Sequence, residues 1–252
     1  MKTITIIGNG NMALSIAKGL KDRFKIEVVG RSFEKLEKFQ DEIGVEIDMF
    51  LLKNFNASDK TVILCTKPSN IEDVAANIKG KPRVLYSVLA GTSIEKLKKV
   101  LKPQGVVRTM PNLAASVGKS MTTLTGDIEF KEEAEEILSS IGSTLWLNSE
   151  KEIDIATALA GSGPAYLALI SEALADGAVK QGLKREDAIS LMRGLFGGFG
   201  ELIQDIHPAL LKDGVMSPGG TTAAGYGALE DGNVRAACID AIEKAYKRAQ
   251  EL

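Results

Sequence analysis

The chain has 252 residues, of which 44% are hydrophobic and 25% charged, and its formal net charge is -2. This composition is that of an ordinary folded protein and excludes a disordered or low-complexity chain. The charges are dispersed without a basic block, which argues against a nucleic-acid partner. Two distant cysteines, Cys65 and Cys238, predict neither a disulfide scaffold nor a metal site, and they favour a reducing, cytoplasmic compartment.

The apolar runs predict a chain that lies outside membranes. Met1 to Thr3 lead directly into a short β-rich run, which leaves no room for a signal peptide. The richest apolar run, residues 156–170, contains Gly161, Gly163 and Pro164, so we expect it to be too short to cross a bilayer.

The first 150 residues alternate β-rich runs with helical patterns. We predict strands over residues 3–7, 25–29, 61–65, 83–88, 106–110, 121–124 and 143–147, and helices over 12–20, 34–42, 70–78, 94–101 and 131–141. Alternation at this spacing predicts βαβ units and a doubly wound, mainly parallel sheet.

The pattern becomes almost entirely helical near Lys151, so we predict two domains, 1–150 and 151–252, with a boundary at about 149–153. Residues 164–179 form a helical pattern that is apolar on most sides, which indicates deep burial. Because a helical domain of this length cannot easily provide that burial, we expect a second subunit to provide it. Another helical pattern contains four glycines, which predicts close helix packing there, with a loop as the alternative: Gly194, Gly197, Gly198 and Gly200.

The segment from Gly8 to Ala13, Gly-Asn-Gly-Asn-Met-Ala, follows the first predicted strand and opens the first helix. It has the Gly-x-Gly-x-x-Ala form of the Rossmann dinucleotide fingerprint, in which Gly8 permits the turn and Gly10 lets the backbone approach a pyrophosphate. The small Ala13 allows close packing of helix and strand. Asn11 and Met12 place free backbone N–H groups at the helix start, where a pyrophosphate binds.

The end of the second strand indicates which dinucleotide binds. An acidic residue there accepts hydrogen bonds from the ribose 2′-hydroxyl of NADH, but the sequence has Arg31 and Ser32, which suit a 2′-phosphate. We therefore predict NADPH as the preferred cofactor, with NADH possible. Glu27 lies earlier in the strand and its register is open, and the alternative for Arg31 is a solvated surface charge.

Three further loops follow predicted strands. Ligands of doubly wound sheets lie beyond the carboxyl ends of the strands, so Lys67 is placed to contact a cofactor or a substrate anion, although a surface lysine is nearly as good an interpretation. Ala90 and Asn112 end the next two strands and are expected to line the nicotinamide pocket.

Two glycine-rich segments interrupt the helical domain: residues 160–165, Ala-Gly-Ser-Gly-Pro-Ala, and residues 217–222, Ser-Pro-Gly-Gly-Thr-Thr. Each is predicted to precede a helix, the second one near Ala223, and to present hydroxyls and free N–H groups to a carboxylate. Ordinary helix capping is the alternative. The single histidine, His207, is expected to be a structural and not a catalytic residue. A site without a strong proton donor favours reduction of an imine that arrives already protonated.

In order along the chain, Gly-Asn-Met-Ala at 10–13, Lys-Pro at 67–68, Ala-Gly at 90–91 and Met-Pro-Asn at 110–112 resemble the pyrroline-5-carboxylate reductases. The resemblance continues through Gly-Ser-Gly-Pro-Ala-Tyr at 161–166, His-Pro at 207–208 and Ser-Pro-Gly-Gly-Thr-Thr at 217–222. It covers essentially the whole chain, and the last two glycine-rich motifs are the most specific.

The resemblance implies an NAD(P)-binding Rossmann domain followed by an all-helical dimerisation domain, in a homodimer that sometimes assembles into a larger ring such as a decamer. It also implies hydride transfer from NAD(P)H to 1-pyrroline-5-carboxylate, giving L-proline as the last step of proline biosynthesis. Ser217, Gly219, Gly220 and Thr221 would hold the substrate carboxylate, and Thr222 would hydrogen-bond the ring nitrogen as the catalytic residue. Lys67 and Ala90 would lie near the nicotinamide.

Two other functions stay open at this point. One is a related reductase of this architecture that acts on another imine or on a 3-hydroxy acid, although the helical domain lacks the expected catalytic lysine or histidine. The other is a non-enzymatic NADP sensor, which would need the dinucleotide loop but not Ser-Pro-Gly-Gly-Thr-Thr. No nucleic-acid or membrane partner is expected.

Overall fold

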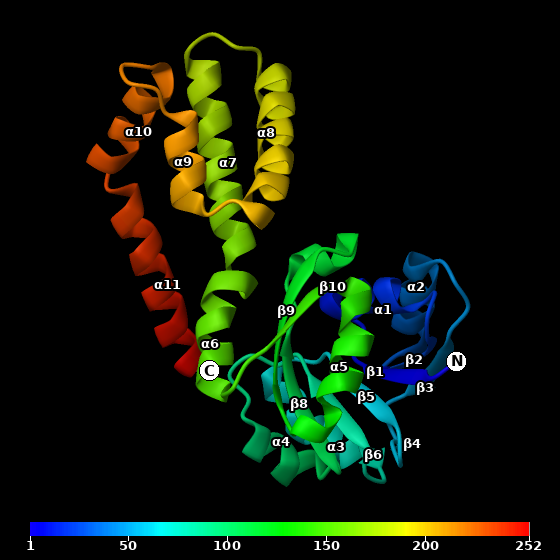
Figure 1. Cartoon of the computed structure of the whole chain (residues 1–252). Helices are drawn as coiled ribbons and strands as arrows, with labels where there is room; N and C mark the ends of the chain where they lie inside the picture. Colours follow the sequence, from blue (N-terminus) through cyan, green and yellow to red (C-terminus); the bar gives the residue numbers. More distant parts are fainter. Residues whose placement is uncertain (252) are drawn as a thin grey trace. The chain divides into compact units, whose positions relative to one another are not determined.

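Residues 1–251 are described by the structure, a computed structural model. They form two compact units, one of residues Met1–Pro164 with the C-terminal residues from Lys244 onward, and one of residues Ala165–Glu243. Each unit is described separately below, with the elements labelled as in Figure 1.

The first unit contains an eight-stranded sheet with the order β10-β9-β8-β7-β5-β1-β2-β3. All neighbouring strands are parallel except β8 and β9, so the prediction of a mainly parallel, doubly wound sheet is confirmed. The strand order reverses at β1, which pairs with β2 on one side and β5 on the other. The strands are β1 (Thr3–Ile7), β2 (Lys25–Gly30), β3 (Asp48–Leu51), β5 (Thr61–Leu64), β7 (Val84–Ser87), β8 (Gly105–Met110), β9 (Ser120–Gly126) and β10 (Gly142–Trp146).

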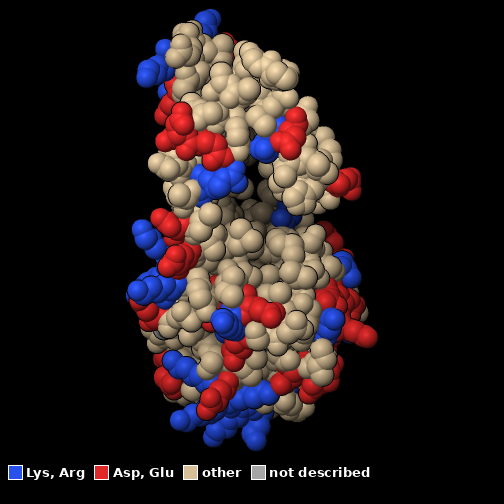
Figure 2. Space-filling model, turned by 60° about the vertical axis from the view of Figure 1, so that its left-hand side comes forward, with Lys and Arg blue, Asp and Glu red and all other residues tan. Residues whose placement is uncertain are grey.

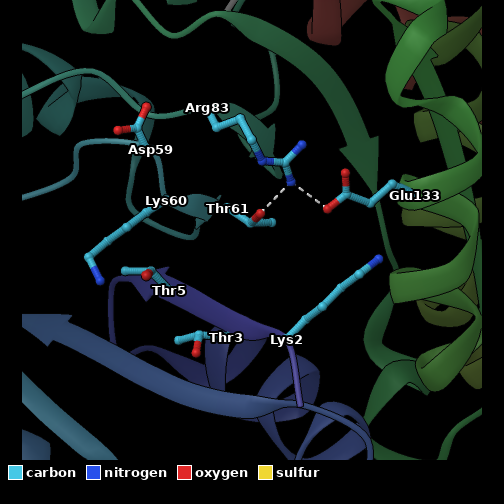
Figure 3. Close-up of a pocket in the computed structure, with 8 residues that line it drawn as sticks. All are labelled: Lys2, Thr3, Thr5, Asp59, Lys60, Thr61, Arg83 and Glu133. Atoms are coloured by element: carbon cyan, nitrogen blue, oxygen red, sulfur yellow. Dashed lines mark hydrogen bonds and ion pairs between the residues drawn. The ribbon is translucent and has the colours of Figure 1, made fainter.

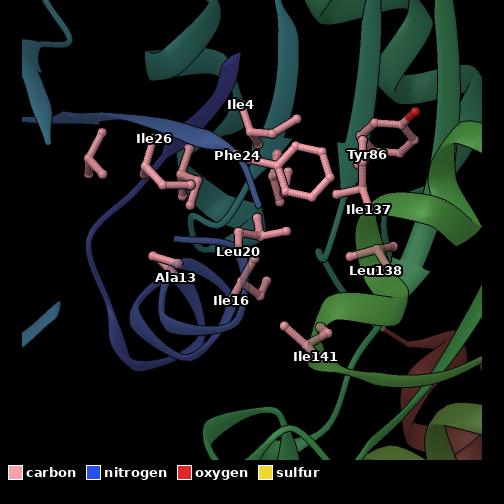
Figure 4. Close-up of a cluster of buried hydrophobic side chains, with 14 of the residues drawn as sticks. Ile4, Ala13, Ile16, Leu20, Phe24, Ile26, Tyr86, Ile137, Leu138 and Ile141 are labelled. Carbon is pink, nitrogen blue, oxygen red and sulfur yellow. The ribbon is translucent and has the colours of Figure 1, made fainter. Parts of the chain in front are cut away.

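Helices cover both faces of this sheet because side chains alternate between the faces along each strand. Ile4 and Ile6 of β1 join the hydrophobic cluster beneath α1 (Asn11–Leu20), α2 (Phe33–Ile43) and α5 (Lys131–Leu138), part of which Figure 4 shows. Ile7 joins the cluster on the opposite face, beneath α3 (Ile71–Asn77) and α4 (Ile94–Leu101). The two layers hold β1 and the segment after it rigidly in the middle of the unit.

Three short strands were not predicted from the sequence. β3 is a four-residue edge strand with half-buried or exposed residues, so it lacks the apolar run of a central strand. β4 (Phe55–Asn56) and β6 (Ile78–Lys79) form a separate two-stranded parallel pair. Two predicted helices end differently from the prediction. The helix predicted over 70–78 ends one residue early, at Asn77, because β6 begins at the next residue. The helix predicted over 131–141 finishes as a 3₁₀ turn at Ser139–Ile141.

One helix of 31 residues runs from Glu150 to Lys180. It consists of α6 (Glu150–Ala156), a π turn (Thr157–Gly161) and α7 (Gly163–Lys180). The prediction that Gly161, Gly163 and Pro164 interrupt this apolar run is wrong, because proline is tolerated in the first turn of a helix. This helix is long and apolar enough to cross a membrane, which corrects the expectation that the apolar run is too short. Long apolar helices at the centre of soluble proteins have the same length and composition.

The second unit is helical and exposes a large apolar surface. It contains most of α7 and α11 (Val234–Gln250), together with α8 (Arg185–Asp205), α9 (Pro208–Val215) and α10 (Thr221–Asp231). Figure 2 shows extensive uncharged surface on this unit between scattered charges. Only Ala175 of α7 is buried, whereas Leu169 is 68% exposed, so within a single chain this apolar helix lacks the burial that its sequence predicts.

The glycine pattern of α8 confirms the prediction of a helix at that position. Gly194, Gly197, Gly198 and Gly200 all lie inside one continuous helix. Among residues 1–251, a Cβ built on any of them meets no atom within 4 Å, so the close helix packing that we expected does not occur between these residues. The glycine face of α8 is open.

A buried arginine joins the first helical turns after β10 to the sheet. Arg108 of β8 is 3% exposed, and its two terminal nitrogens each lie 2.9 Å from a carboxylate of α6, one from Glu150 and one from Asp154. Glu150 also accepts a hydrogen bond from the backbone N–H of Ile94, at the start of α4. These contacts fix α6 against the carboxyl end of β8.

A charged cavity of about 470 Å³ lies at the amino ends of the strands (Figure 3). Its cations already have carboxylate partners: Lys2 with Glu136, Lys60 with Glu27, and Arg83 with Glu133. Since ligands of doubly wound sheets bind beyond the carboxyl ends of the strands, and these charges are paired internally, we interpret this cluster as structural.

Candidate active site

A second cavity, of about 500 Å³, lies beyond the carboxyl ends of β1, β2 and β5. This is the point where the strand order reverses, and it is where doubly wound folds bind their ligands. The cavity collects predicted site residues from three separate loops, namely Gly8, Gly10, Asn11, Met12, Arg31 and Lys67.

Gly8 is required by the backbone itself. Its φ of +118° is unfavourable for other residues, and a Cβ there would lie 2.4 Å from the main-chain oxygen of Cys65. Its N–H donates to the main-chain oxygen of Val29 over 2.9 Å, and the N–H of Cys65 donates to Ile7 over 2.8 Å. Gly8 therefore closes the turn between three neighbouring strands, and its own N–H is not available to a ligand.

Gly10 has a different environment from Gly8. It is the N-cap of α1 with extended backbone, and a Cβ added to it meets nothing within 4 Å. The space in front of Gly10 and the unpaired N–H groups of Asn11 and Met12 therefore fit a pyrophosphate, which the positive end of the helix attracts. The first turn of α1 carries no acidic residue, and Ala13 is fully buried against the core.

The charged residues that line this cavity in the described part of the chain are Arg31, Lys35 and Lys67, all of them cations. Lys35 was not singled out from the sequence, where it lies among the alternating charges of an amphipathic helix. The loop before α1 also holds Lys35 near the start of α2, because Asn9 Nδ2 donates to the main-chain oxygen of Lys35 over 3.4 Å. The three cations suit an anionic ligand.

Arg31 has a partner that the sequence did not reveal. Its guanidinium Nη2 lies 2.8 Å from Oδ2 of Asp73, in the first turn of α3. Ser32 is the N-cap of α2, but its hydroxyl makes no capping hydrogen bond, and it is not among the residues that line the cavity.

The structure settles the register of Glu27. This residue is buried, accepts from the Thr5 hydroxyl over 2.7 Å and forms an ion pair with Lys60 at 2.8 Å. It therefore belongs to the cluster at the amino ends of the strands, and among the described residues it is not part of the cofactor cavity.

Cys65 lies between the cavity and the hydrophobic core. Burial raises the pKa of its thiol to about 12, so the thiol is neutral at physiological pH and a poor nucleophile. Cys65 thus packs as a small, partly buried apolar residue.

Ala90 and Asn112 do not line the cavity. The main-chain oxygen of Ala90 accepts from the Thr92 hydroxyl over 3.3 Å. The side chain of Asn112 is engaged at both ends: Oδ1 accepts from the N–H of Ala114 over 3.1 Å, and Nδ2 donates to the main-chain oxygen of Ala160 over 3.0 Å.

Residues 160–165 do not form the loop that the sequence predicted. The chain is helical on both sides of a single turn residue, Ser162, whose N–H donates to the main-chain oxygen of Thr157 over 3.0 Å. The expectation of a second set of free N–H groups ahead of a helix is therefore wrong at this position. The small residues there accommodate the π turn, a helix irregularity that is often found at functional sites.

Residues 217–220 do form a loop, and α10 begins directly after it at Thr221, two residues earlier than predicted. Gly219 has a φ of +70°, and Gly220 donates its N–H to the main-chain oxygen of Ser217 over 3.0 Å. Thr221 and Thr222 occupy the first two positions of the helix, where N–H groups lack helical partners. Within residues 1–251 the hydroxyls of Ser217, Thr221 and Thr222 make no hydrogen bond, so they are available to a ligand.

His207 caps α9, because its Nδ1 accepts from the N–H of Ala209 over 3.2 Å. This contact supports the structural role that the sequence suggested. In the part of the chain that the structure describes, no group of three His, Cys, Asp or Glu side chains is arranged to hold a metal ion.

Comparison with known proteins identifies both parts of the chain. Residues 150–252 match the family model described as pyrroline-5-carboxylate reductase dimerisation, and residues 3–91 match one described as NADP oxidoreductase, coenzyme F420-dependent. A pyrroline-5-carboxylate reductase of Thermus thermophilus is 35% identical over 259 residues, covering 99% of this chain and 98% of that protein.

Solved structures agree with these matches. A 1-pyrroline-5-carboxylate reductase from Streptococcus pyogenes superposes with a TM-score of 0.85 and 31% identity, covering 99% of this chain and 98% of that one. The Plasmodium falciparum enzyme, with NADP bound, gives a TM-score of 0.82 at 26% identity and covers 99% and 97% of the two chains.

The fold and the cavity define a nicotinamide-dinucleotide-dependent oxidoreductase with a helical C-terminal part. More particularly, the chain belongs to the pyrroline-5-carboxylate reductase family. It is an oxidoreductase acting on a C=N bond, its role is in proline biosynthesis, and its dimerisation domain indicates a homo-oligomer.

Proposed function

We propose that the chain reduces 1-pyrroline-5-carboxylate to L-proline with NADPH as the preferred reductant. The observation that carries this proposal is the Ser-Pro-Gly-Gly-Thr-Thr loop, whose hydroxyls and N–H groups surround the start of α10. A carboxylate is the natural ligand of such a helix start. A dinucleotide sensor would have no need of it.

The dinucleotide fits the cavity of the first unit. Gly10, Asn11 and Met12 hold the pyrophosphate through backbone N–H groups, while Gly8 and Ala13 shape the turn and its packing. Lys67 contacts the nicotinamide ribose, and Ala90 lies near the amide. When bound, the dihydronicotinamide supplies a hydride for the imine carbon.

The preference for NADPH rests on charge. Arg31, supported by the nearby Lys35, neutralises the 2′-phosphate, and Ser32 donates to it through a hydroxyl that has no capping role. Because the carboxyl end of β2 presents Gly30 and then Arg31, the strand itself offers no carboxylate there to accept from the 2′-hydroxyl of NADH. NADH is accordingly the weaker reductant.

The helical unit binds the substrate. Ser217, Gly219, Gly220 and Thr221 hold the carboxylate, and the Thr222 hydroxyl hydrogen-bonds the ring nitrogen. The nitrogen takes up one proton while C5 takes up the hydride, which balances the conversion of the C=N bond to an amine. Positioning of the two reactants therefore supplies most of the catalysis.

Asn112 contributes to this site indirectly rather than as a direct cofactor ligand. Its amide is used by Ala114 and Ala160, so it orders the segment after β8 and the π turn. Residues 1–150 and 151–252 are the proposed cofactor and substrate domains; the match of residues 150–252 to the dimerisation family model supports this division, although by its contacts α6 belongs to the compact unit of the sheet.

The assembly is a homodimer formed through the helical domain, and a decamer is the larger form we propose. The exposed apolar residues of α7 and the open glycine face of α8 support burial against another subunit. We place the enzyme in the cytoplasm, without nucleic-acid or membrane partners, in keeping with its two free thiols.

The test is oxidation of NADPH by the purified full chain with 1-pyrroline-5-carboxylate, compared with NADH and with a six-membered cyclic imine. Rapid turnover selective for the five-membered ring and for NADPH is expected. Binding of NADPH without turnover, by protein that is folded and oligomeric, would instead favour the sensor. Preference for the larger ring would favour the related imine reductase.

A further inference from the structure

The ion pair between Arg31 and Asp73 lies at the edge of the cofactor cavity. Arg31 lines the cavity directly after β2, and Asp73 reaches it from α3 with a distance of 2.8 Å between Nη2 and Oδ2. The other carboxylate oxygen, Oδ1, accepts from Asn77 Nδ2 over 3.1 Å. Asp73 is thus held by two donors in a fixed orientation toward Arg31.

This pair is accessible and weak enough to be exchanged. The Arg31 side chain is 58% exposed and that of Asp73 49%. Exposed pairs contribute little to stability because water screens them. The guanidinium is therefore shared between Asp73 and any anion in the cavity.

A 2′-phosphate and a 2′-hydroxyl respond to this arrangement differently. The phosphate needs the guanidinium, must displace the carboxylate or share Arg31 with it, and is repelled by the negative charge of Asp73. A neutral hydroxyl has no such competition. Lys35 also lines the cavity, and within residues 1–251 it forms no ion pair that would restrain it in the same way.

Resting on the proposed function, we propose that Asp73 is a specificity-determining residue: its carboxylate competes with the 2′-phosphate for Arg31 and limits the selectivity of the enzyme for NADPH over NADH. Removing that charge while keeping the shape raises the selectivity. The role belongs to Asp73 in particular, because its neighbour Glu72 is exposed and, in the described chain, forms no hydrogen bond or ion pair with Arg31.

The experiment measures binding of NADPH and NADH to the full chain by titration calorimetry, without imine. In Asp73→Asn we expect NADPH to bind about three- to tenfold more tightly, with NADH unchanged, and we expect the gain to shrink at high salt. Glu72→Gln is the matched control, since it removes the same charge from the same helical turn. It should change the ratio of the NADPH affinity to the NADH affinity far less.

A second pair of variants tests the mechanism. In an Arg31→Ala background, Asp73→Asn should no longer raise the NADPH to NADH ratio beyond the effect of Glu72→Gln. The proposal is overturned if Asp73→Asn leaves the ratio unchanged or lowers it, if both cofactors tighten equally, or if Arg31→Ala itself leaves the ratio unaltered. Because these measurements use no imine, a failure of the proposed reductase activity would be seen separately, in turnover.

Discussion

The side-chain amide of Asn112 donates a hydrogen bond to the main-chain oxygen of Ala160 over 3.0 Å. In a regular helix that oxygen would accept from the N–H of residue 164, but residue 164 is proline and has no N–H. Asn112, which is 48 residues away in the chain, supplies the missing donor. The Met-Pro-Asn segment thereby completes the helix irregularity at Gly-Ser-Gly-Pro.

This relationship predicts a coupling between Asn112 and Pro164. Asn112→Ala should lower the free energy of unfolding by about 1–3 kcal/mol, because it leaves the Ala160 oxygen without its donor and removes the cap of Ala114. In a Pro164→Ala background, where the helical N–H is restored, the same substitution should cost less. Denaturant unfolding at a fixed protein concentration measures both costs, and equal costs in the two backgrounds would contradict the assignment.

The two glycines of the dinucleotide loop should respond differently to alanine. Gly8→Ala places a Cβ 2.4 Å from the Cys65 oxygen at a φ of +118°, so we expect a loss of stability of about 1–3 kcal/mol or more. Gly10→Ala meets no atom within 4 Å and should leave stability nearly unchanged while it weakens cofactor binding.

Thermal unfolding and NADPH titration of the two glycine variants separate these effects. If Gly10→Ala bound NADPH like the natural chain, the space in front of Gly10 would not hold the pyrophosphate.

Thr222 and Ser217 should affect different kinetic constants. Thr222→Val removes the hydroxyl proposed to contact the ring nitrogen and should lower kcat, by about tenfold or more, while Thr222→Ser should retain most of it. Ser217→Ala should mainly raise the Michaelis constant for the imine, because a carboxylate contact is present in both ground and transition states. Steady-state kinetics at saturating NADPH measures both, and an unchanged kcat in Thr222→Val would remove Thr222 from the catalytic role.

The buried thiol of Cys65 should show its raised pKa in two ways. With a pKa of about 12, only about one thiol in ten thousand is ionised at pH 8, so iodoacetamide should leave Cys65 unmodified until the chain unfolds. Mass spectrometry of the folded and the denatured protein tests this, and rapid alkylation in the folded state would contradict the raised pKa.

The same pKa affects stability at high pH. The folded thiol holds its proton more tightly than an unfolded thiol, whose pKa is near 9.0. The contribution of this thiol to the free energy of unfolding is therefore complete below pH 9 and is lost as the pH rises toward 12. Cys65→Ala should therefore show a shallower fall in the free energy of unfolding across that window. Burial also raises the pKa of Tyr86, so a residual slope should persist in the variant.

Most of the local structure could be predicted from the sequence. The alternation of strands and helices, the turn at Gly8 and the presence of a helix after residues 217–220 follow from side-chain periodicity and glycine geometry over a few residues, although that helix starts at Thr221 and not near Ala223. The edge strand β3 was missed because it has no buried face of its own. The helix through Pro164 was missed because proline and glycine usually end a helix, and only the surrounding contacts show that it continues.

The sequence by itself determined the fold class, the dinucleotide loop and the Ser-Pro-Gly-Gly-Thr-Thr loop, because each is encoded by neighbouring residues. Only the tertiary structure decided that Arg31 meets Asp73, 42 residues further along, and that Asn112 supplies a donor to Ala160. It also placed Glu27 at the amino ends of the strands, with Thr5 and Lys60. These partners are chosen by which strand and helix ends the packed sheet brings together, and no local pattern of residues carries that information.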